Sequence, residues 1–331
     1  MSGFLVEKQK GEGLVSAAQY EKSRRLRMLF LDIFPFIGLI FVLIFFGIVT
    51  KGGIYSWYNV KSVFSQSFLF IIGGLGVSFL LAQGSFDLSM ASVIALSAIL
   101  GARIAPFNTA LGVFVTIGVA TLIGLLNGLI YSEFNLNTWI HGLAINFMFG
   151  GLLYTAMGKV SNVPVVKSLT NLNNPINEVA ILIIVSIIVI FVFNYTVFGK
   201  HCKAIGGGVK ASEQSGVNVK RVKMIAFVIS GFIAGIVAVL SMIRNGAASD
   251  GTGNMFHFNV MVCMVLGGVP VTGGTAVKLR GIFIGAITVT IITIGMVSWG
   301  ISARAQELVK GILFVAILVI TTKIRNSVDH I

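Results

Sequence analysis

The sequence predicts an all-α integral membrane protein with about ten transmembrane helices, an internal repeat and both termini in the cytoplasm. Three observations predict this class: 56% of the 331 residues are hydrophobic, 11% are charged, and the mean hydropathy is +0.96. A chain with so few polar side chains cannot cover the surface of a soluble domain. Apolar runs long enough to cross a bilayer recur from residue 29 to residue 322.

The N-terminal half contains six predicted spans. Residues 1–27 are polar and lack the apolar run of a secretory signal, so we expect them to form a cytoplasmic tail. The transmembrane domain covers 28–322, and Pro35 lies in the early turns of its first span, where proline is tolerated best. The first six apolar runs are 29–49, 63–82, 88–105, 110–131, 139–157 and 179–198.

A basic loop, 199–223, separates these spans from four more. The later apolar runs are 224–243, 256–269, 281–299 and 308–322, and residues 323–331 form a second polar tail. With ten spans, both termini lie on the same side of the membrane as the 199–223 loop. That side carries 16 Lys and Arg residues against seven on the other, which predicts that it is the cytoplasmic side.

The 199–223 loop is predicted to contain a short helix. Residues 209–215 allow about two helical turns after a glycine run, and Gly216 stands where a C-terminal cap is expected. A helix that a membrane protein exposes to water suggests a docking surface for a soluble partner. On the opposite side, the longest loop is 158–178, an exposed surface for whatever arrives from outside.

The segment 82–92 joins the second and third spans without a basic residue and contains Ser85, Asp87 and Ser89. A carboxylate near membrane depth is costly unless it faces a cavity or the protein interior. Two interpretations remain open: Asp87 and Ser89 cap the next helix, or Asp87 contacts a solute. A second glycine-rich break, 266–281, suggests that the two halves of the chain are related by an internal repeat.

Other polar residues fall inside the predicted spans, and each either bonds two helices together or lines a solute path. They are Asn127, His141, Asn146, His257, Asn259 and Lys310. The residues that we select as candidates for a solute pathway are Ser85, Asp87, Ser89, Asn127, Asn146 and Asn259.

The net charge of +13 has a better explanation in membrane topology and contact with anionic lipid than in nucleic-acid binding. Neither HExxH nor GxxxxGK[ST] occurs, and Cys202 and Cys263 cannot form a CxxC pair. A serine protease built on Ser78 and His141 is the weakest alternative. We therefore expect no catalytic residue, cofactor or metal, and no nucleic acid among the partners.

Four stretches resemble a known family. They are GSFDLSMAS at 84–92, the loop at 198–223, VLGGVPVTGGTAVKLRGIFIGA at 265–286 and QELVKGILFVAILV at 306–319. Together they resemble the permease subunits of bacterial ABC importers for ribose, xylose or galactose. The wider superfamily includes nucleoside, autoinducer-2 and branched-chain amino-acid permeases. The chain departs from the family at Ser85-Phe86 and at NLNTWI, 135–140, which lacks the usual proline.

The resemblance implies a multi-pass permease of the bacterial cytoplasmic (inner) membrane with several partners. These are an ABC ATPase, an extracytoplasmic solute-binding protein and a second permease subunit, identical or not. The short helix would be the coupling helix against the ATPase, with Lys210, Glu213, Gln214, Ser215, Gly216 and Val217 at the contact. A nucleoside or other small-metabolite permease, and a stand-alone channel or secondary carrier, are the alternatives.

Overall fold

The computed structural model describes residues 32–134, 136–270 and 273–329. In these residues every regular element is a helix apart from one pair of short strands, which confirms the all-α class. The predicted tail 1–27 lies outside the described residues. The predicted boundary at 323 is not a break in structure, because the last helix continues through it to Asp329.

Eight described helices are long and apolar enough to cross a membrane. They are Asp32–Val49, α2 (Trp57–Ala82), α4 (Thr109–Phe134), α5 (Thr138–Met157), α7 (Pro175–Tyr195), α10 (Val219–Asn245), α12 (Leu279–Ser298) and Ala303–Lys323 of α13 (Ala303–Asp329). The shorter elements are η1 (Gly53–Tyr55), α3 (Met90–Ile104), β1 (Asn162–Pro164), α6 (Lys167–Thr170), α8 (Val197–Gly207), α9 (Val209–Gln214), β2 (Ala247–Ser249), α11 (Phe256–Leu266) and η2 (Gly274–Ala276).

Two of the ten predicted spans, 88–105 and 256–269, are short helices. The 15 residues of α3 and the 11 of α11 extend about 22 Å and about 16 Å, less than the ~30 Å of a bilayer core. Each follows an irregular segment, 83–89 before α3 and 246–255 before α11. In the first of these, Ser85, Phe86 and Asp87 are at most 4% exposed. The irregular backbone is therefore buried in protein, as it must be at membrane depth.

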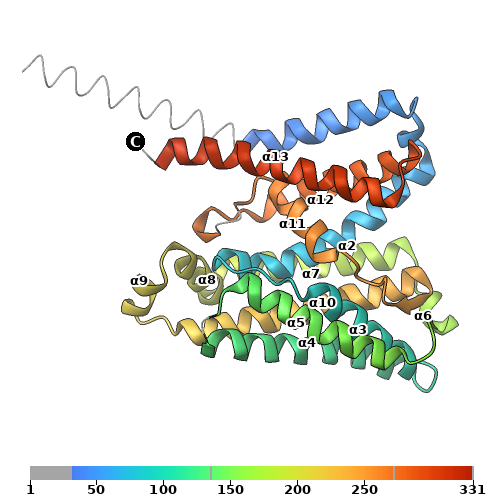
Figure 1. Cartoon of the computed structure of the whole chain (residues 1–331), viewed down its shortest axis with the longest axis horizontal. Helices are drawn as coiled ribbons and strands as arrows, with labels where there is room; N and C mark the ends of the chain where they lie inside the picture. Colours follow the sequence, from blue (N-terminus) through green and yellow to red (C-terminus); the bar gives the residue numbers. More distant parts are fainter. Residues whose placement is uncertain (1–31, 135, 271–272, 330–331) are drawn as a thin grey trace, which may run out of the picture.

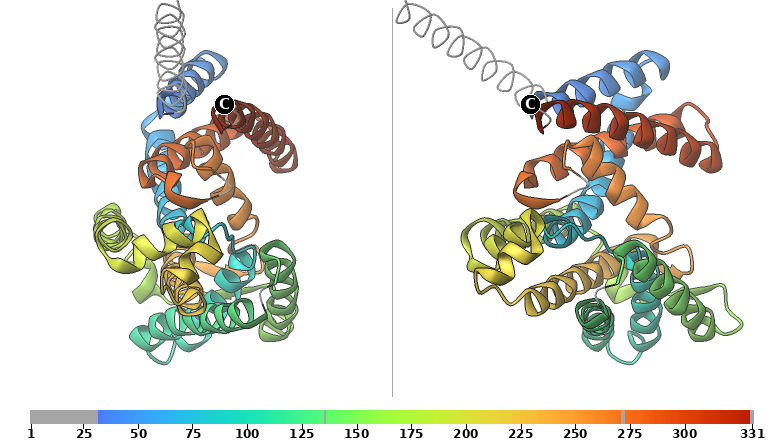
Figure 2. Two further views of the ribbon diagram at one scale, coloured as in Figure 1. Left: turned by 90° about the vertical axis from the view of Figure 1, so that its left-hand side faces the viewer. Right: turned by 60° about the vertical axis from the view of Figure 1, so that its left-hand side comes forward.

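The long helices run side by side along the long axis of the molecule (Figure 1). The α8–α9 segment and the C-terminal end of α13 lie at one end of this bundle, and α6 lies at the other. Figures 1 and 2 both show the helix Asp32–Val49 and α13 on the side of the bundle opposite α4. The central loop and the C-terminal end of α13 thus share one end of the bundle.

The helix contacts occur in corresponding pairs. α10 packs on α4 as α12 packs on α2, and α3 packs on α4 and α5 as α11 packs on α12 and α13. α3 also meets α10 where α11 meets α2. If α2, α3, α4 and α5 are matched in order with α10, α11, α12 and α13, each of these helix contacts has a counterpart in the other half of the chain. This correspondence supports the predicted internal repeat. The counterpart of the 83–89 break is then 246–255, and not 266–281, which joins α11 to α12.

Glycines bring the paired helices into backbone contact. A Cβ added to Gly124 on α4 would lie 2.6 Å from the carbonyl oxygen of Phe227 on α10. A Cβ on Gly231 of α10 would lie 2.6 Å from the carbonyl oxygen of Ala120. Small residues at such crossings let membrane helices approach closely. The backbones of α4 and α10 therefore pack directly against each other.

Candidate functional site

The α8–α9 segment projects from one end of the bundle. Thr196 caps α8, its hydroxyl accepting a hydrogen bond from the backbone N–H of Gly199. α9 ends as predicted at Gly216, whose φ of +83° is the left-handed conformation that glycine adopts freely. The N–H groups of Gly216 and Val217 bond the carbonyls of Glu213 (2.9 Å) and Ser212 (3.0 Å). This Schellman pairing satisfies the helix end and confirms the short helix.

The predicted contact residues on α9 are accessible. Lys210, Glu213, Gln214, Ser215 and Gly216 are exposed, and Val217 is half-buried against the core. Ser212 is 5% exposed and directs its hydroxyl to the carbonyl of Gly208. α9 therefore presents one surface to the water and is anchored by the opposite one. Its role as a coupling helix stays a prediction.

Behind α9, three chain segments meet through glycines, a feature that we call the glycine junction (Gly206, Gly273, Gly274, Ala82 and Gly84). A Cβ on Gly206, in the last turn of α8, would overlap the carbonyl oxygen of Ala82 and lie 2.7 Å from the nitrogen of Gly274. A Cβ on Gly273, where φ is +75°, would overlap the carbonyl oxygen of Leu81 and lie 2.8 Å from the nitrogen of Gly84. Backbone thus rests on backbone, with no side chain between to absorb a displacement.

The glycine junction joins α8, the helix that leads into α9, to both halves of the bundle. Ala82 ends α2 immediately before the 83–89 segment, and η2 lies between α11 and α12. The glycines at 206–208 and 273–274 stand out in the sequence, but their contact is not predictable from it. Nothing local indicates a contact between residues so far apart in the chain.

The 83–89 segment contributes to a buried group that we call the polar cluster (Ser85, Asp87, Ser89, Asn127 and Tyr131). One carboxylate oxygen of Asp87 accepts hydrogen bonds from the N–H (2.8 Å) and hydroxyl of Ser89. The amide nitrogen of Asn127 donates to the Ser89 hydroxyl at 2.8 Å. The hydroxyls of Ser85 and Tyr131 lie 2.7 Å apart. Four of the six predicted pathway residues therefore meet in one place.

Asp87 closes a local turn with Ser89 immediately before α3. Its acceptor contact with the Ser89 N–H lies at the start of α3, where an anion is favoured by the helix dipole. Asp87 is 4% exposed and Ser89 is fully buried, so a solute would reach them only after the helices rearrange. Ser89 occupies the N-cap position of α3 but makes no side-chain capping bond to it, so both capping by Asp87 and Ser89 and direct contact with solute stay predictions.

Two atoms beside the polar cluster keep unused hydrogen-bonding capacity. Among the described residues, the amide oxygen of Asn127 and the Nε2 atom of His141 are buried without a protein partner. The His141 ring packs on Tyr131 with 5.9 Å between ring centroids. Leaving such an atom unpaired costs about 1–3 kcal/mol. These two atoms are thus the unpaired polar groups at the polar cluster.

The other two predicted pathway residues lie elsewhere. Asn146 on α5 is half-buried, and its amide oxygen accepts from the N–H of Ser92 at 3.3 Å. Asn259 belongs to the second half of the chain, where it accepts a 2.8 Å bond from Nζ of Lys310 and donates to the carbonyl of Met255. Asn146 thus joins α5 to α3 beside the cluster, whereas Asn259 and Lys310 join α11 to α13.

At the end of the bundle opposite α9, the predicted 158–178 loop is ordered. β1 within it pairs antiparallel with β2, and the N–H of Val165 bonds the carbonyl of Gly246 at 3.0 Å. The hydroxyls of Ser168 and Thr109 lie 2.8 Å apart. This end is therefore tied to the 246–255 segment that leads into α11.

Comparisons with known proteins agree with this architecture. The family model described as "Branched-chain amino acid transport system / permease component" matches residues 59–318. The fructose import permease protein FrcC of Rhizobium meliloti is 24% identical over 308 residues, 88% of this chain and 85% of that protein. The galactose/methyl galactoside import permease protein MglC of Haemophilus influenzae is 27% identical over 286 residues, 78% of this chain and 84% of that protein.

A third relative has a different named cargo. The autoinducer 2 import system permease protein LsrC of Enterobacter sp. is 25% identical over 285 residues, 83% of this chain and 82% of that protein. No solved structure gives a significant match.

Proposed function

The chain belongs to the family of branched-chain amino acid transport system permease components, a family of non-catalytic ABC transporter subunits, and from this we propose that it imports a monosaccharide across the bacterial cytoplasmic membrane. The observation that carries the proposal is the match over 59–318, which includes the α8–α9 segment and all but the first of the spanning helices. An ABC ATPase hydrolyses ATP for this subunit, and a solute-binding protein delivers the ligand.

The coupling mechanism runs through α9. Closure of the ATP-bound ATPase pushes on the surface formed by Lys210, Glu213, Gln214, Ser215 and Gly216, with Val217 at its edge. The backbone contacts of the glycine junction carry this displacement to the end of α2 and to the α11–α12 connection. The proposal is supported by the exposure of α9 and by the absence of any side chain between the backbones of Gly206 and Ala82.

The solute pathway opens beside the two short helices. Movement of the 83–89 segment would expose Ser85, Asp87, Ser89 and Asn127 to the path, and their hydroxyl and amide groups suit an uncharged polyol. Asn146 and Asn259 contribute from the two halves of the chain. A second permease subunit, identical or related, completes the path, and the 158–178 end receives the solute-binding protein.

The monosaccharide assignment rests on relatives named for fructose and for galactose or methyl galactoside. The second candidate, a nucleoside or other small metabolite, is favoured by the relative named for autoinducer 2. Uptake of labelled monosaccharides and nucleosides by a deletion strain, with and without a plasmid copy of the gene, distinguishes them. The proposal predicts loss of uptake of at least one monosaccharide, restored by the plasmid, and loss confined to a nucleoside would overturn it.

A further inference from the structure

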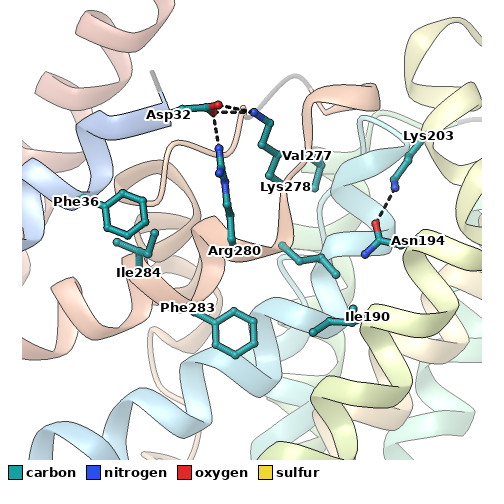
Figure 3. A pocket seen from close by; sticks show the side chains of 11 residues that line it. Asp32, Phe36, Ile190, Asn194, Lys203, Val277, Lys278, Arg280, Phe283 and Ile284 are labelled. Carbon is teal, nitrogen blue, oxygen red and sulfur yellow. Dashed lines mark hydrogen bonds and ion pairs between the residues drawn. The ribbon is translucent and has the colours of Figure 1, made fainter. Parts of the chain in front are cut away.

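A cleft opens on the side of the bundle at the end where α8 lies. It has a volume of about 850 Å³ and is formed by the start of the helix Asp32–Val49, by α7, α8 and the start of α12 (Figure 3). None of the residues of the polar cluster or of the α9 surface lines it. Its chemistry therefore needs a separate explanation.

The rim of the cleft is basic. The carboxylate of Asp32 accepts bonds from Nζ of Lys278 (2.7 and 2.9 Å) and pairs with a guanidinium nitrogen of Arg280 at 2.7 Å. A third cation, Lys203, donates to the side-chain oxygen of Asn194 at 3.1 Å and lies 4.3 Å above the Phe193 ring. The cleft thus holds three cations and one carboxylate, an excess of two positive charges, and Lys203 lies across the cleft from the Asp32 ion pairs (Figure 3).

The floor of the cleft is apolar. Phe36, Ile190, Phe283 and Ile284 line it, and Figure 3 shows Phe283 and Ile190 on the far side of Arg280 from Asp32. Below them the side of the bundle stays apolar, with Ile37 at 52% and Ile187 at 63% exposed. Basic side chains at the end of the helix bundle lie beside an apolar groove and an exposed apolar surface. This combination matches the anionic head group and the acyl chains of a lipid.

We propose that this cleft binds one anionic phospholipid, its phosphate among Lys203, Lys278 and Arg280 and an acyl chain along Phe283 and Ile190. Charge complementarity selects this occupant over a zwitterionic lipid, because the rim has two cations in excess. It also disfavours the N-terminal tail, since residues 1–27 carry six basic and three acidic side chains. A free phosphate would leave the apolar floor without a partner.

Burial lowers the pKa of the Lys203 ammonium. An anion beside this group would stabilise its charged form. The ion pairs of Asp32 are half-exposed, so removing them is expected to leave the fold intact.

The test measures the stability of the purified full-length chain in detergent as phosphatidylglycerol or phosphatidylcholine is titrated in. We expect phosphatidylglycerol to raise Tm more than phosphatidylcholine does. The double substitution Lys278→Gln with Arg280→Gln should raise the half-saturating phosphatidylglycerol fraction by about tenfold or more, since each basic group near an anionic lipid contributes on the order of a factor of five. Lys51→Gln with Lys61→Gln, two exposed cations of the opposite end, is the matched control.

Asp32→Asn distinguishes lipid binding from damage to the fold. It removes the competing carboxylate and leaves the cations, so the half-saturating fraction should fall. The proposal is overturned if the two lipids stabilise the wild type equally, or if the rim and control variants respond alike. An equal response to inorganic phosphate would assign the cleft to a free anion. Weaker binding of the ATPase with unchanged lipid preference would assign it to the partner protein.

Discussion

Replacing Gly206 by alanine tests whether the glycine junction transmits force. The added Cβ would stand 2.7 Å from the nitrogen of Gly274 and overlap the carbonyl oxygen of Ala82. Ordinary van der Waals contact begins at 3.4 Å, so α8 must withdraw from η2 by about 0.7 Å, and further from α2. Overpacking of this kind costs ~1–3 kcal/mol. Because both faces of Gly206 meet backbone, the strain cannot be relieved by a side-chain rotation.

The neighbouring glycine supplies a matched control. A Cβ on Gly207 would meet nothing within 4 Å, although it lies in the same turn of α8. Gly207→Ala should therefore be neutral or stabilise the helix by about 0.5–1 kcal/mol. The two variants change the same atoms one residue apart, so a difference between them reports the junction and not helix propensity.

The assay is transport by proteoliposomes that contain the chain, its ATPase and its solute-binding protein. We expect Gly206→Ala to lower the number of solute molecules transported per ATP by about fivefold or more, the population shift that ~1 kcal/mol produces. Gly207→Ala should keep the wild-type ratio. If folded Gly206→Ala protein transports with the wild-type ratio, the junction does not couple the two processes.

Three further predictions concern α9, the polar cluster and the thiol of α8. Glu213→Trp or Gly216→Val should leave membrane insertion intact and uncouple ATP hydrolysis from uptake. Normal uptake in both variants would show that α9 only holds the ATPase and does not couple ATP hydrolysis to transport. Asp87→Ala should lower the free energy of unfolding by about 1–3 kcal/mol because the N–H and hydroxyl of Ser89 lose their buried acceptor, measured as a fall in Tm. Asp87→Asn with wild-type Tm but reduced uptake would favour solute contact, and full uptake would leave Asp87 with a structural role only. Burial raises the pKa of the Cys202 thiol to about 12, so at pH 8 the thiol is protonated. We expect maleimide labelling of Cys202 to be slow until the chain is denatured, and rapid labelling of the folded chain would contradict this burial.

The features that the sequence predicted well depend on residues close together in the chain. The helix α9 and its cap required only a glycine run, a short polar segment and Gly216, because the Schellman bonds join residues five apart or fewer. The spanning helices were likewise predictable from continuous apolar runs. Their ends differ by a few residues, as at the start of α10, where Val219 to Lys223 is helical before the apolar run begins at Met224.

The features that the sequence did not predict depend on contacts across the fold. The apolar run 256–269 looks the same for a full span and for α11, which ends at Leu266 and follows the irregular segment 246–255. Asn259 looked equivalent to Asn127 as an in-membrane amide, yet Lys310 binds it in the other half of the bundle. Gly206 and Gly273 revealed their close approach only once α8, η2 and α2 were placed together.

Cross-linking α9 to the ATPase tests the central claim most directly. In Glu213→Cys, a short thiol-reactive cross-linker applied to the assembled transporter in inside-out vesicles should join this chain to the ATPase subunit, with a yield that changes when ATP is bound. The proposed coupling would be contradicted if the cysteine at position 213 reacted only with reagents added outside intact cells. It would also be contradicted if this cysteine formed no cross-link to the ATPase subunit.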